Sequence, residues 1–191
     1  MRKLIVQEWL TLDGYAADKD GELFFVESKE LNKYADYDVL KFLESIDTIL
    51  LGAVTYKLFV DFWPTATTGQ ELIADKLNET DKIIFSNTIT HAPWGKWKEA
   101  TVINGDAVAA VRKLKQLEGK DMILWGSISL AQSLMKENLI DEYHINICPL
   151  IIGQGLAFFP NDIRVIDLEL LEMKKYDSGL IVLKYRSKKT S

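Results

Sequence analysis

Short runs of apolar residues alternate along the chain with stretches in which apolar residues recur every three or four positions. The runs at 47–52 and 122–126 are almost continuously apolar and end in glycine. Such runs are typical of β-strands that are covered on both faces of a sheet. The pattern predicts strands at residues 3–10, 47–52, 81–86, 99–103, 121–126, 140–148, 165–176 and 179–187.

The stretches between the runs have the spacing of amphipathic helices, with charged or polar residues on the side opposite the apolar one. In one of them Ile128, Ala131 and Leu134 share a side, and Ser127 or Ser129 stands where a helix cap is expected. The pattern predicts helices at residues 30–45, 54–62, 70–78, 106–117 and 128–137.

The end of the chain differs from the rest. Residues 165–170 alternate between apolar and polar, and a turn-forming segment at 177–179 separates them from a second apolar stretch, which predicts a β-hairpin. We therefore expect one domain, residues 1–191, with an α/β fold in three layers: a mostly parallel central sheet flanked by helices and completed by a C-terminal antiparallel hairpin.

Composition narrows the class of protein. The chain has 191 residues, of which 48% are hydrophobic, so it can form a sizeable core without disulfides or a structural metal. A net charge of -5 argues against nonspecific binding to nucleic acid. The single cysteine, Cys148, lies in an apolar run and is interpreted as a core residue. His91 and His144 have no partner at ligand spacing, so no metal site is predicted.

The sequence has no secretion or membrane signal that we recognise. The apolar stretch after Met1 is broken at once by Gln7 and Glu8, unlike a signal peptide. No apolar run approaches the ~18 residues that a membrane helix requires. We therefore expect a cytoplasmic protein whose partner is a small molecule rather than a nucleic acid or a membrane.

A glycine directly after a predicted strand opens the helix at 128–137. The segment Gly126, Ser127, Ile128 and Ser129 combines a tight turn, free backbone N–H groups at a helix start and two hydroxyl groups. The positive end of a helix dipole is a natural phosphate site. The alternative is an ordinary strand–turn–helix junction with a serine cap, and this segment alone does not decide between them.

Two further strand ends carry small or polar residues. Gly52 is followed by Thr55 in the first turn of a helix, and Ser86, Asn87 and Thr88 follow the strand at 81–86. Each of these segments has a plain structural explanation, as a helix cap or as a turn. Because ligands of open α/β sheets bind outside the carboxyl ends of the strands, the three segments together indicate a dinucleotide lying across one edge of the sheet.

Candidate residues for the substrate side lie in or after the first predicted strand. Asp13 and Gly14 form a turn signal, the segment from Asp13 to Gly21 is a candidate lid, and either Asp13 or Glu8 would assist protonation if burial raised its pKa. Acids in such positions are also commonly solvated or part of a turn. The aromatic residues Trp9, Tyr56 and Trp63 would form the wall of a planar substrate site or, equally, part of the core.

In order along the chain, these motifs resemble the dihydrofolate reductase-like superfamily. They are most similar to stand-alone relatives of the C-terminal reductase domain of the riboflavin-biosynthesis protein RibD, and the similarity covers roughly residues 3 to 185. The motifs are Leu12-Asp13-Gly14-Tyr15, Leu50-Leu51-Gly52 with Thr55-Tyr56, Phe62-Trp63-Pro64, Phe85-Ser86-Asn87-Thr88, Trp125-Gly126-Ser127, and Leu139 to Tyr143 followed by Pro149 to Gly155.

The resemblance implies an NADPH-dependent reductase, usually a homodimer, that transfers hydride to a C=N or C=O group of a pterin- or pyrimidine-like heterocycle. It implies that the pyrophosphate lies near Thr55 and 126–129, the adenosine near 86–88, and the nicotinamide and substrate beneath the Asp13 loop. Ala53 and Asn87 stand where the family often has arginine, which leaves NADH possible as the cofactor.

Two other functions stay open. The missing arginines also fit a non-catalytic dimer that binds a nucleotide or another small ligand in a degenerate reductase site. A structural homodimer without any nucleotide site is the third possibility. The zinc deaminase pattern of the bifunctional riboflavin enzyme, H-x-E with P-C-x-x-C, does not occur in this sequence.

Overall fold

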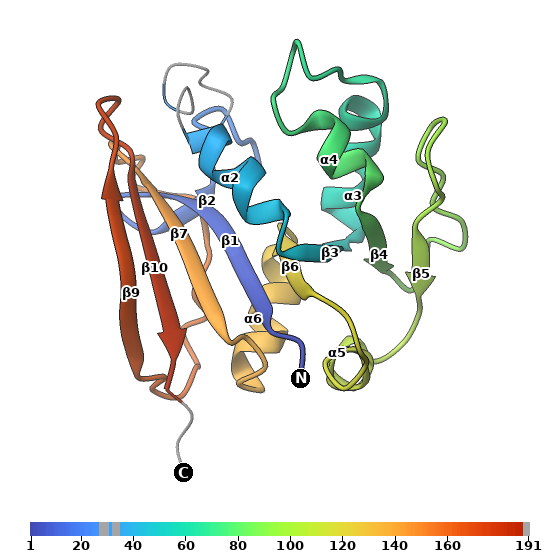
Figure 1. Ribbon diagram of the computed structural model, residues 1–191. Coiled ribbons are helices and arrows are strands. Elements are labelled where there is room, and N and C mark those ends of the chain that lie inside the picture. Colours follow the sequence, from blue (N-terminus) through green and yellow to red (C-terminus); the bar gives the residue numbers. More distant parts are fainter. Residues whose placement is uncertain (27–30, 32–34, 189–191) are drawn as a thin grey trace.

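The computed structural model describes residues 1–26, 31 and 35–188 and has an eight-stranded sheet between two layers of helices (Figure 1). The order in the sheet is β5-β4-β3-β6-β1-β7-β10-β9. The strands are β1 Leu4–Thr11, β3 Ile46–Gly52, β4 Asp81–Phe85, β5 Thr101–Ile103, β6 Asp121–Trp125, β7 Glu142–Cys148, β9 Leu168–Lys175 and β10 Ile181–Ser187.

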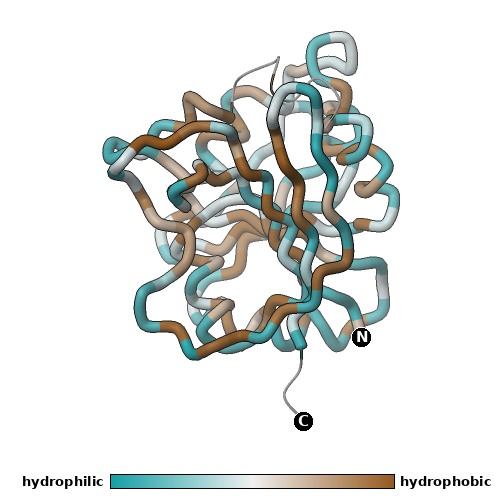
Figure 2. The backbone as a smooth tube through the Cα atoms, turned by 90° about the vertical axis from the view of Figure 1, so that its left-hand side faces the viewer, coloured by the Kyte–Doolittle hydropathy of each residue, from teal (hydrophilic) through white to brown (hydrophobic). Residues whose placement is uncertain are grey.

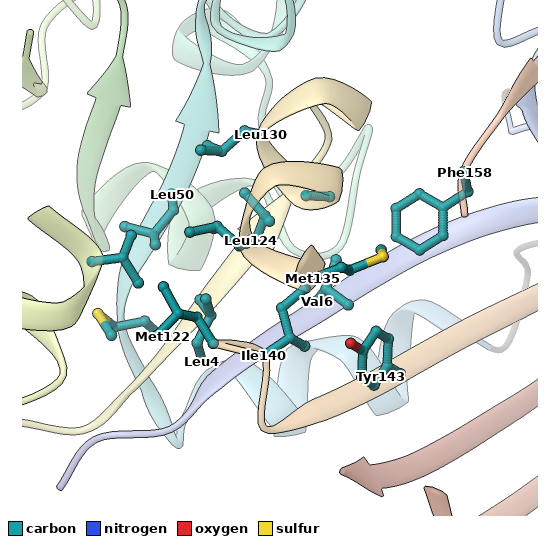
Figure 3. Packing of buried hydrophobic residues seen from close by; sticks show 14 of the residues in the cluster. Leu4, Val6, Leu50, Met122, Leu124, Leu130, Met135, Ile140, Tyr143 and Phe158 are labelled. Carbon is teal, nitrogen blue, oxygen red and sulfur yellow. The ribbon is translucent and has the colours of Figure 1, made fainter. Parts of the chain in front are cut away.

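The helices cover the two faces unequally. They are α2 Ala35–Leu43, α3 Ala53–Phe62, α4 Ala74–Glu79, α5 Ala107–Leu114 and α6 Ile128–Lys136, with a 3-10 turn, η1, at Trp63–Thr65. Helices α2, α3 and α4 pack on the face to which Ile5 of β1 belongs. Helices α5 and α6 pack on the other face, to which Leu4, Val6 and Leu10 belong. Figure 3 shows this second cluster, in which Met135 of α6 lies beside Val6.

The predicted α/β fold is confirmed. Pairing is parallel from β5 to β7, while β10 is antiparallel to both β7 and β9. The buried centre of the sheet accounts for the apolar runs, because six of the seven residues of β3 are buried. Figure 2 views the molecule from the β9 side, where hydrophobic and hydrophilic residues both occur along the hairpin and all eight residues of β9 are exposed.

Several boundaries differ from the sequence prediction. The hairpin strand predicted from 165 begins at Leu168, whose partner in β10 is Ser187. The helix predicted at 70–78 begins only at Ala74, and part of the helix predicted at 30–45 (30 and 32–34) lies outside the described residues. The predicted eight strands also omitted a small second sheet, formed by β2 Tyr15–Ala17 and β8 Leu156–Ala157.

Candidate functional site at the carboxyl edge of the sheet

Two helices start side by side at the carboxyl edge of the sheet, one on each face. Strands β3 and β6 are parallel neighbours, β3 ends at Gly52 and Gly126 directly follows β6. Helix α3 follows Gly52, and α6 begins two residues after Gly126. The segments 52–56 and 126–129 are therefore brought together, as the sequence analysis predicts.

The two starts interlock through their glycines. A Cβ atom on Gly52 would overlap the side chain of Ser127, and a Cβ on Gly126 would lie 2.6 Å from Oγ1 of Thr55. Gly126 also has a φ of 65°, which favours glycine. Both glycines are therefore required by the close approach of the other helix start.

Neither helix start is capped by a side chain. Gly52 and Ser127 are the N-cap residues of α3 and α6, and neither makes a side-chain cap hydrogen bond. The expectation that Ser127 caps α6 through its hydroxyl is wrong, because Ser127 has φ 62° and ψ 84°, outside the extended conformation of a capping serine. Its Oγ lies 3.3 Å from that of Ser129 instead.

The first turns of α3 and α6 also contain no acidic residue. The other two described helices of eight or more residues differ: α2 has Asp36 and Asp38 in its first turn, and Asp106 caps α5 by accepting a hydrogen bond from the Ala109 N–H at 3.0 Å. An uncapped helix start without a carboxylate presents free N–H groups and a positive dipole end. The edge thus combines two such starts, an arrangement suited to an anion.

The third predicted segment, residues 86–88, follows the end of β4, the strand next to β3. Its hydrogen bonds connect it to the residues at the end of β5. Ser86 Oγ accepts hydrogen bonds from the N–H groups of Thr88 at 3.1 Å and Ile89 at 2.9 Å. The Asn87 side-chain oxygen accepts from Gly105 N–H at 2.7 Å. These contacts show the turn-forming role that the sequence left open, and Asn87 and Thr88 remain exposed at the same edge.

The two predicted acids have opposite environments. Burial raises the pKa of Glu8 to about 8, although the backbone N–H of Trp9 donates to its carboxyl at 3.1 Å. Hydrogen bonds from the Thr11 side chain and from the N–H groups of Gly153 and Ile152 lower the pKa of Asp13. The condition set for proton transfer, a raised pKa, is therefore met by Glu8 and not by Asp13, whose carboxylate joins its loop to the loop after β7.

The predicted aromatic wall lies on the α3 face. Tyr56 is buried and donates a hydrogen bond to the Pro93 carbonyl oxygen at 3.0 Å, and Trp63 is half-buried against Phe59. Trp9 packs against the cluster next to α2, with its indole N–H buried and without a partner among the described residues. Glu8 points to the opposite face, towards the α6 cluster, because successive residues of a strand alternate in direction.

Sequence reasoning missed two groups of polar side chains. Burial and the charge of Glu71 raise the pKa of Asp36, on α2, to about 6. Gln7, His144 and Asn146 are buried on one face of β1 and β7. A signal for the second group was present in the sequence, because Glu142, His144 and Asn146 recur at every second position of the strand predicted at 140–148.

The described part of the chain has neither a membrane-spanning helix nor a metal-binding cluster of side chains. No helix there is both long and apolar enough to cross a membrane. Those same residues contain no group of three or more His, Cys, Asp or Glu that could hold a metal ion. Cys148 is buried, and burial raises the pKa of its thiol to about 12, as expected for a core residue.

The sheet order and the antiparallel hairpin are those of the dihydrofolate reductase-like α/β fold. Dihydrofolate reductase from Enterococcus faecalis, in a structure complexed with NADP(H), aligns with a TM-score of 0.60 at 13% identity, over 98% of this chain and 97% of that one.

The model of the RibD C-terminal domain family matches residues 2–182, so the chain belongs to this family. The uncharacterized protein YyaP of Bacillus subtilis is 29% identical over 187 residues, which cover 96% of this chain and 94% of YyaP. A deaminase/5-amino-6-(5-phosphoribosylamino)uracil reductase from Thermotoga maritima aligns with a TM-score of 0.70 at 15% identity, over 98% of this chain and 57% of that chain. Its two activities belong to a longer protein, of which this chain matches a little over half.

Proposed function

We propose that this protein is an NAD(P)H-dependent reductase that transfers hydride to a C=N or C=O group of a small planar heterocycle of the pterin or pyrimidine type. The observation that carries the proposal is the pair of uncapped, acid-free helix starts at Gly52 and Gly126. Membership in the RibD C-terminal domain family and the likeness of fold to reductases support it.

The residues at the edge fit the diphosphate of a dinucleotide. The N–H groups that start α3 and α6 lie on two faces of one edge, and the hydroxyls of Thr55, Ser127 and Ser129 add possible donors. In this proposal Gly52, Thr55 and 126–129 hold the pyrophosphate. Ser86, Asn87 and Thr88, one strand further along the edge, hold the adenosine end.

The bound cofactor would supply the hydride, and the protein's part is to orient the reactants, exclude water and supply a proton. Glu8 is proposed as the proton donor, because a carboxyl with a pKa of about 8 keeps its proton at neutral pH. Because β6 ends opposite Gln7, Glu8 lies beyond the end of β6, and the substrate is proposed to lie there, with Glu8 on one side and the wall of Trp9, Tyr56 and Trp63 on the α3 side. Asp13 is proposed to hold the loop that follows β7 over the substrate, through the hydrogen bond that it accepts from Gly153 N–H.

The cofactor preference is expected to be weak. Ala53 and Asn87 offer no cation for a 2′-phosphate, and the Asn87 side-chain oxygen is already bonded to Gly105 N–H. NADPH is the proposed cofactor on the basis of family, with NADH as an alternative. We also propose that the protein is a cytoplasmic homodimer.

Titration with NADPH and NADH, followed by tryptophan fluorescence, tests the binding half of the proposal. Oxidation of the cofactor, followed by its absorbance in the presence of dihydropterins, aminopyrimidines and simple carbonyls, tests the catalytic half. Saturable binding together with turnover of one of these classes is expected. Absence of cofactor binding would rule out the proposal.

A non-catalytic nucleotide-binding dimer is the second candidate. It is favoured by the absence of a positively charged side chain at positions 53 and 87. It predicts saturable binding of the dinucleotide without oxidation by any member of the panel, in the wild type and in Glu8→Gln alike.

A further inference from the structure

A small cavity with buried polar residues on its floor lies beneath α2, on the sheet face opposite α6. It opens to solvent, has a volume of about 30 Å³ and is floored by Gln7, His144 and Asn146 (Figure 1 shows α2 beside β1). These three side chains are 5%, 4% and 2% exposed. A floor of buried polar groups is costly unless each group has a hydrogen-bond partner.

Two of the floor residues have hydrogen-bonding groups for which the described residues provide no partner. Trp125 donates its indole N–H to the side-chain oxygen of Gln7 at 2.7 Å. Because an indole N–H can only donate, this bond fixes the orientation of the Gln7 amide and leaves its NH₂ group as a donor beside the cavity. The Asn146 amide makes no hydrogen bond to a described residue.

The geometry of the sheet places these amides at a useful separation. Gln7 is the register partner of His144, so Asn146 is its diagonal neighbour across two parallel strands. From the spacing of strands and the rise along a strand, the Cα atoms of such neighbours lie roughly 8 Å apart, and Gln7 and Asn146 make no hydrogen bond to each other, which leaves both amides available to a bridging group.

The charges at the rim are already paired within the protein. Asp38 accepts hydrogen bonds from Lys174 and from the Tyr176 hydroxyl, and Lys184 pairs with Glu172 at 2.7 Å. The rim therefore gives no net attraction to an ion. Phe42 of α2, tilted against His144 with ring centroids 4.9 Å apart, adds an apolar wall.

We propose that this cavity is a second binding site for the terminal primary carboxamide of a small neutral molecule. It lies apart from the proposed cofactor site at the carboxyl edge of the sheet. The carboxamide oxygen would accept from the Gln7 NH₂ group, and its own NH₂ and oxygen would pair with the Asn146 amide. The volume admits such an end group, with the remainder of the ligand lying towards the rim.

NMR with acetamide as the probe tests this site. Acetamide at millimolar concentration is expected to shift the side-chain NH₂ signals of Gln7 and Asn146, and acetate at the same concentration is not. The shifts are expected to persist when NADPH is saturating, because the cavity lies apart from the proposed cofactor site. Absence of the acetamide shifts, an equal response to acetate, or loss of the shifts with NADPH overturns the proposal.

A peptide probe distinguishes two sources of the same amide. The tripeptide Gly-Gln-Gly carries a carboxamide on a protein backbone and is expected to bind less tightly than acetamide, since the cavity is small. Tighter binding of the peptide overturns the assignment to a small molecule.

Two asparagines provide a matched control. Asn78 is as buried as Asn146 but is fully bonded, because its NH₂ group donates to the Trp63 carbonyl at 2.8 Å and its oxygen accepts from Trp94 at 2.6 Å. Asn146→Leu is expected to abolish the acetamide shifts and to raise the Tm of the ligand-free protein, whereas Asn78→Leu lowers it. A fall in Tm for Asn146→Leu like that for Asn78→Leu would show that the amide already has a partner, and would overturn the proposal.

Discussion

The side chain of Ser127 lies directly against the Cα atom of Gly52, so the residue that precedes α3 is in contact with the residue that precedes α6. This contact holds two helix starts together across the edge of the sheet. The proposed cofactor site depends on it, because either start alone is a weaker anion site than the pair.

Gly52→Ala tests the contact. Gly52 has φ -84° and ψ 169°, which alanine adopts freely, so the added methyl group acts only through its overlap with Ser127. We expect a loss of about 1–3 kcal/mol in the free energy of unfolding, measured by urea denaturation, together with weaker binding of NADPH.

The double variant Gly52→Ala with Ser127→Gly serves as the control. Removal of the Ser127 side chain makes room for the methyl group, and glycine tolerates the positive φ at position 127. The free energy of unfolding and the binding of NADPH are both expected to be largely restored. The expected coupling free energy between the two substitutions is about 1 kcal/mol or more. Additive effects of the two substitutions would show that the contact does not link the helix starts.

Glu8 gives the protein a pH dependence with a defined sign. A carboxyl whose pKa rises from an ordinary value near 4.5 to about 8 on folding contributes its full stability below pH 4.5, and loses it as the pH rises towards 8. Between pH 5 and 8 the wild type should lose a free energy of unfolding on the order of a few kcal/mol relative to Glu8→Gln, measured by denaturation at each pH. Parallel pH profiles for the two proteins would contradict the raised pKa.

The proposed proton transfer by Glu8 has its own test. If Glu8 donates the proton, kcat falls above about pH 8, and Glu8→Gln lowers kcat by about 100-fold or more while the Kd for NADPH changes little. An unchanged kcat in Glu8→Gln would assign the proton donor to another group, for which Asp36 is the next acid to test.

Two buried tyrosines should respond in opposite ways to loss of the hydroxyl group. The Tyr143 hydroxyl is buried among Val6, Met135 and Ile140 and has no hydrogen-bond partner among the described residues (Figure 3). Tyr143→Phe is expected to leave the Tm unchanged or to raise it. Tyr56→Phe loses the bond to Pro93 and should cost about 1 kcal/mol. A clear loss of stability in Tyr143→Phe would show that its hydroxyl is satisfied.

Asp13 should stabilise the loop after β7 rather than the chemistry. Its carboxylate accepts a hydrogen bond from Gly153 N–H at 2.8 Å, so Asp13→Asn weakens that bond while it keeps the shape of the side chain. Faster hydrogen exchange is expected at the Gly153 amide, with little change at the Gly179 amide, which donates to the Tyr176 carbonyl oxygen instead. Unchanged exchange at Gly153 would remove Asp13 from this role.

The sequence alone predicted the layers of the fold and the edge of the sheet at which the candidate site lies. Apolar runs that end in glycine located β3 and β6, and the rule that ligands lie beyond the carboxyl ends of strands located the site. It was not sufficient for β2 and β8, because strands of three and two residues carry no period that a pattern can detect. Pairing between segments about 140 residues apart is decided by tertiary packing.

The pattern of apolar and polar residues also did not predict the side-chain environments at the site. Glu8 and Asp13 were both candidates for proton transfer, and only the structure separates a carboxyl whose pKa is raised by desolvation from one held by backbone N–H groups. Ser127 looked like a helix cap because its residue type favours that role, but contact with Gly52 accompanies a left-handed conformation that prevents it.

A crystal structure of the protein soaked with NADPH tests the central claim most directly. The account predicts pyrophosphate oxygens at about 2.7–3.2 Å from backbone nitrogens in the first turns of α3 and α6, between Gly52 and Gly126. A dinucleotide that binds elsewhere on the protein, with these two helix starts left to solvent, would contradict it.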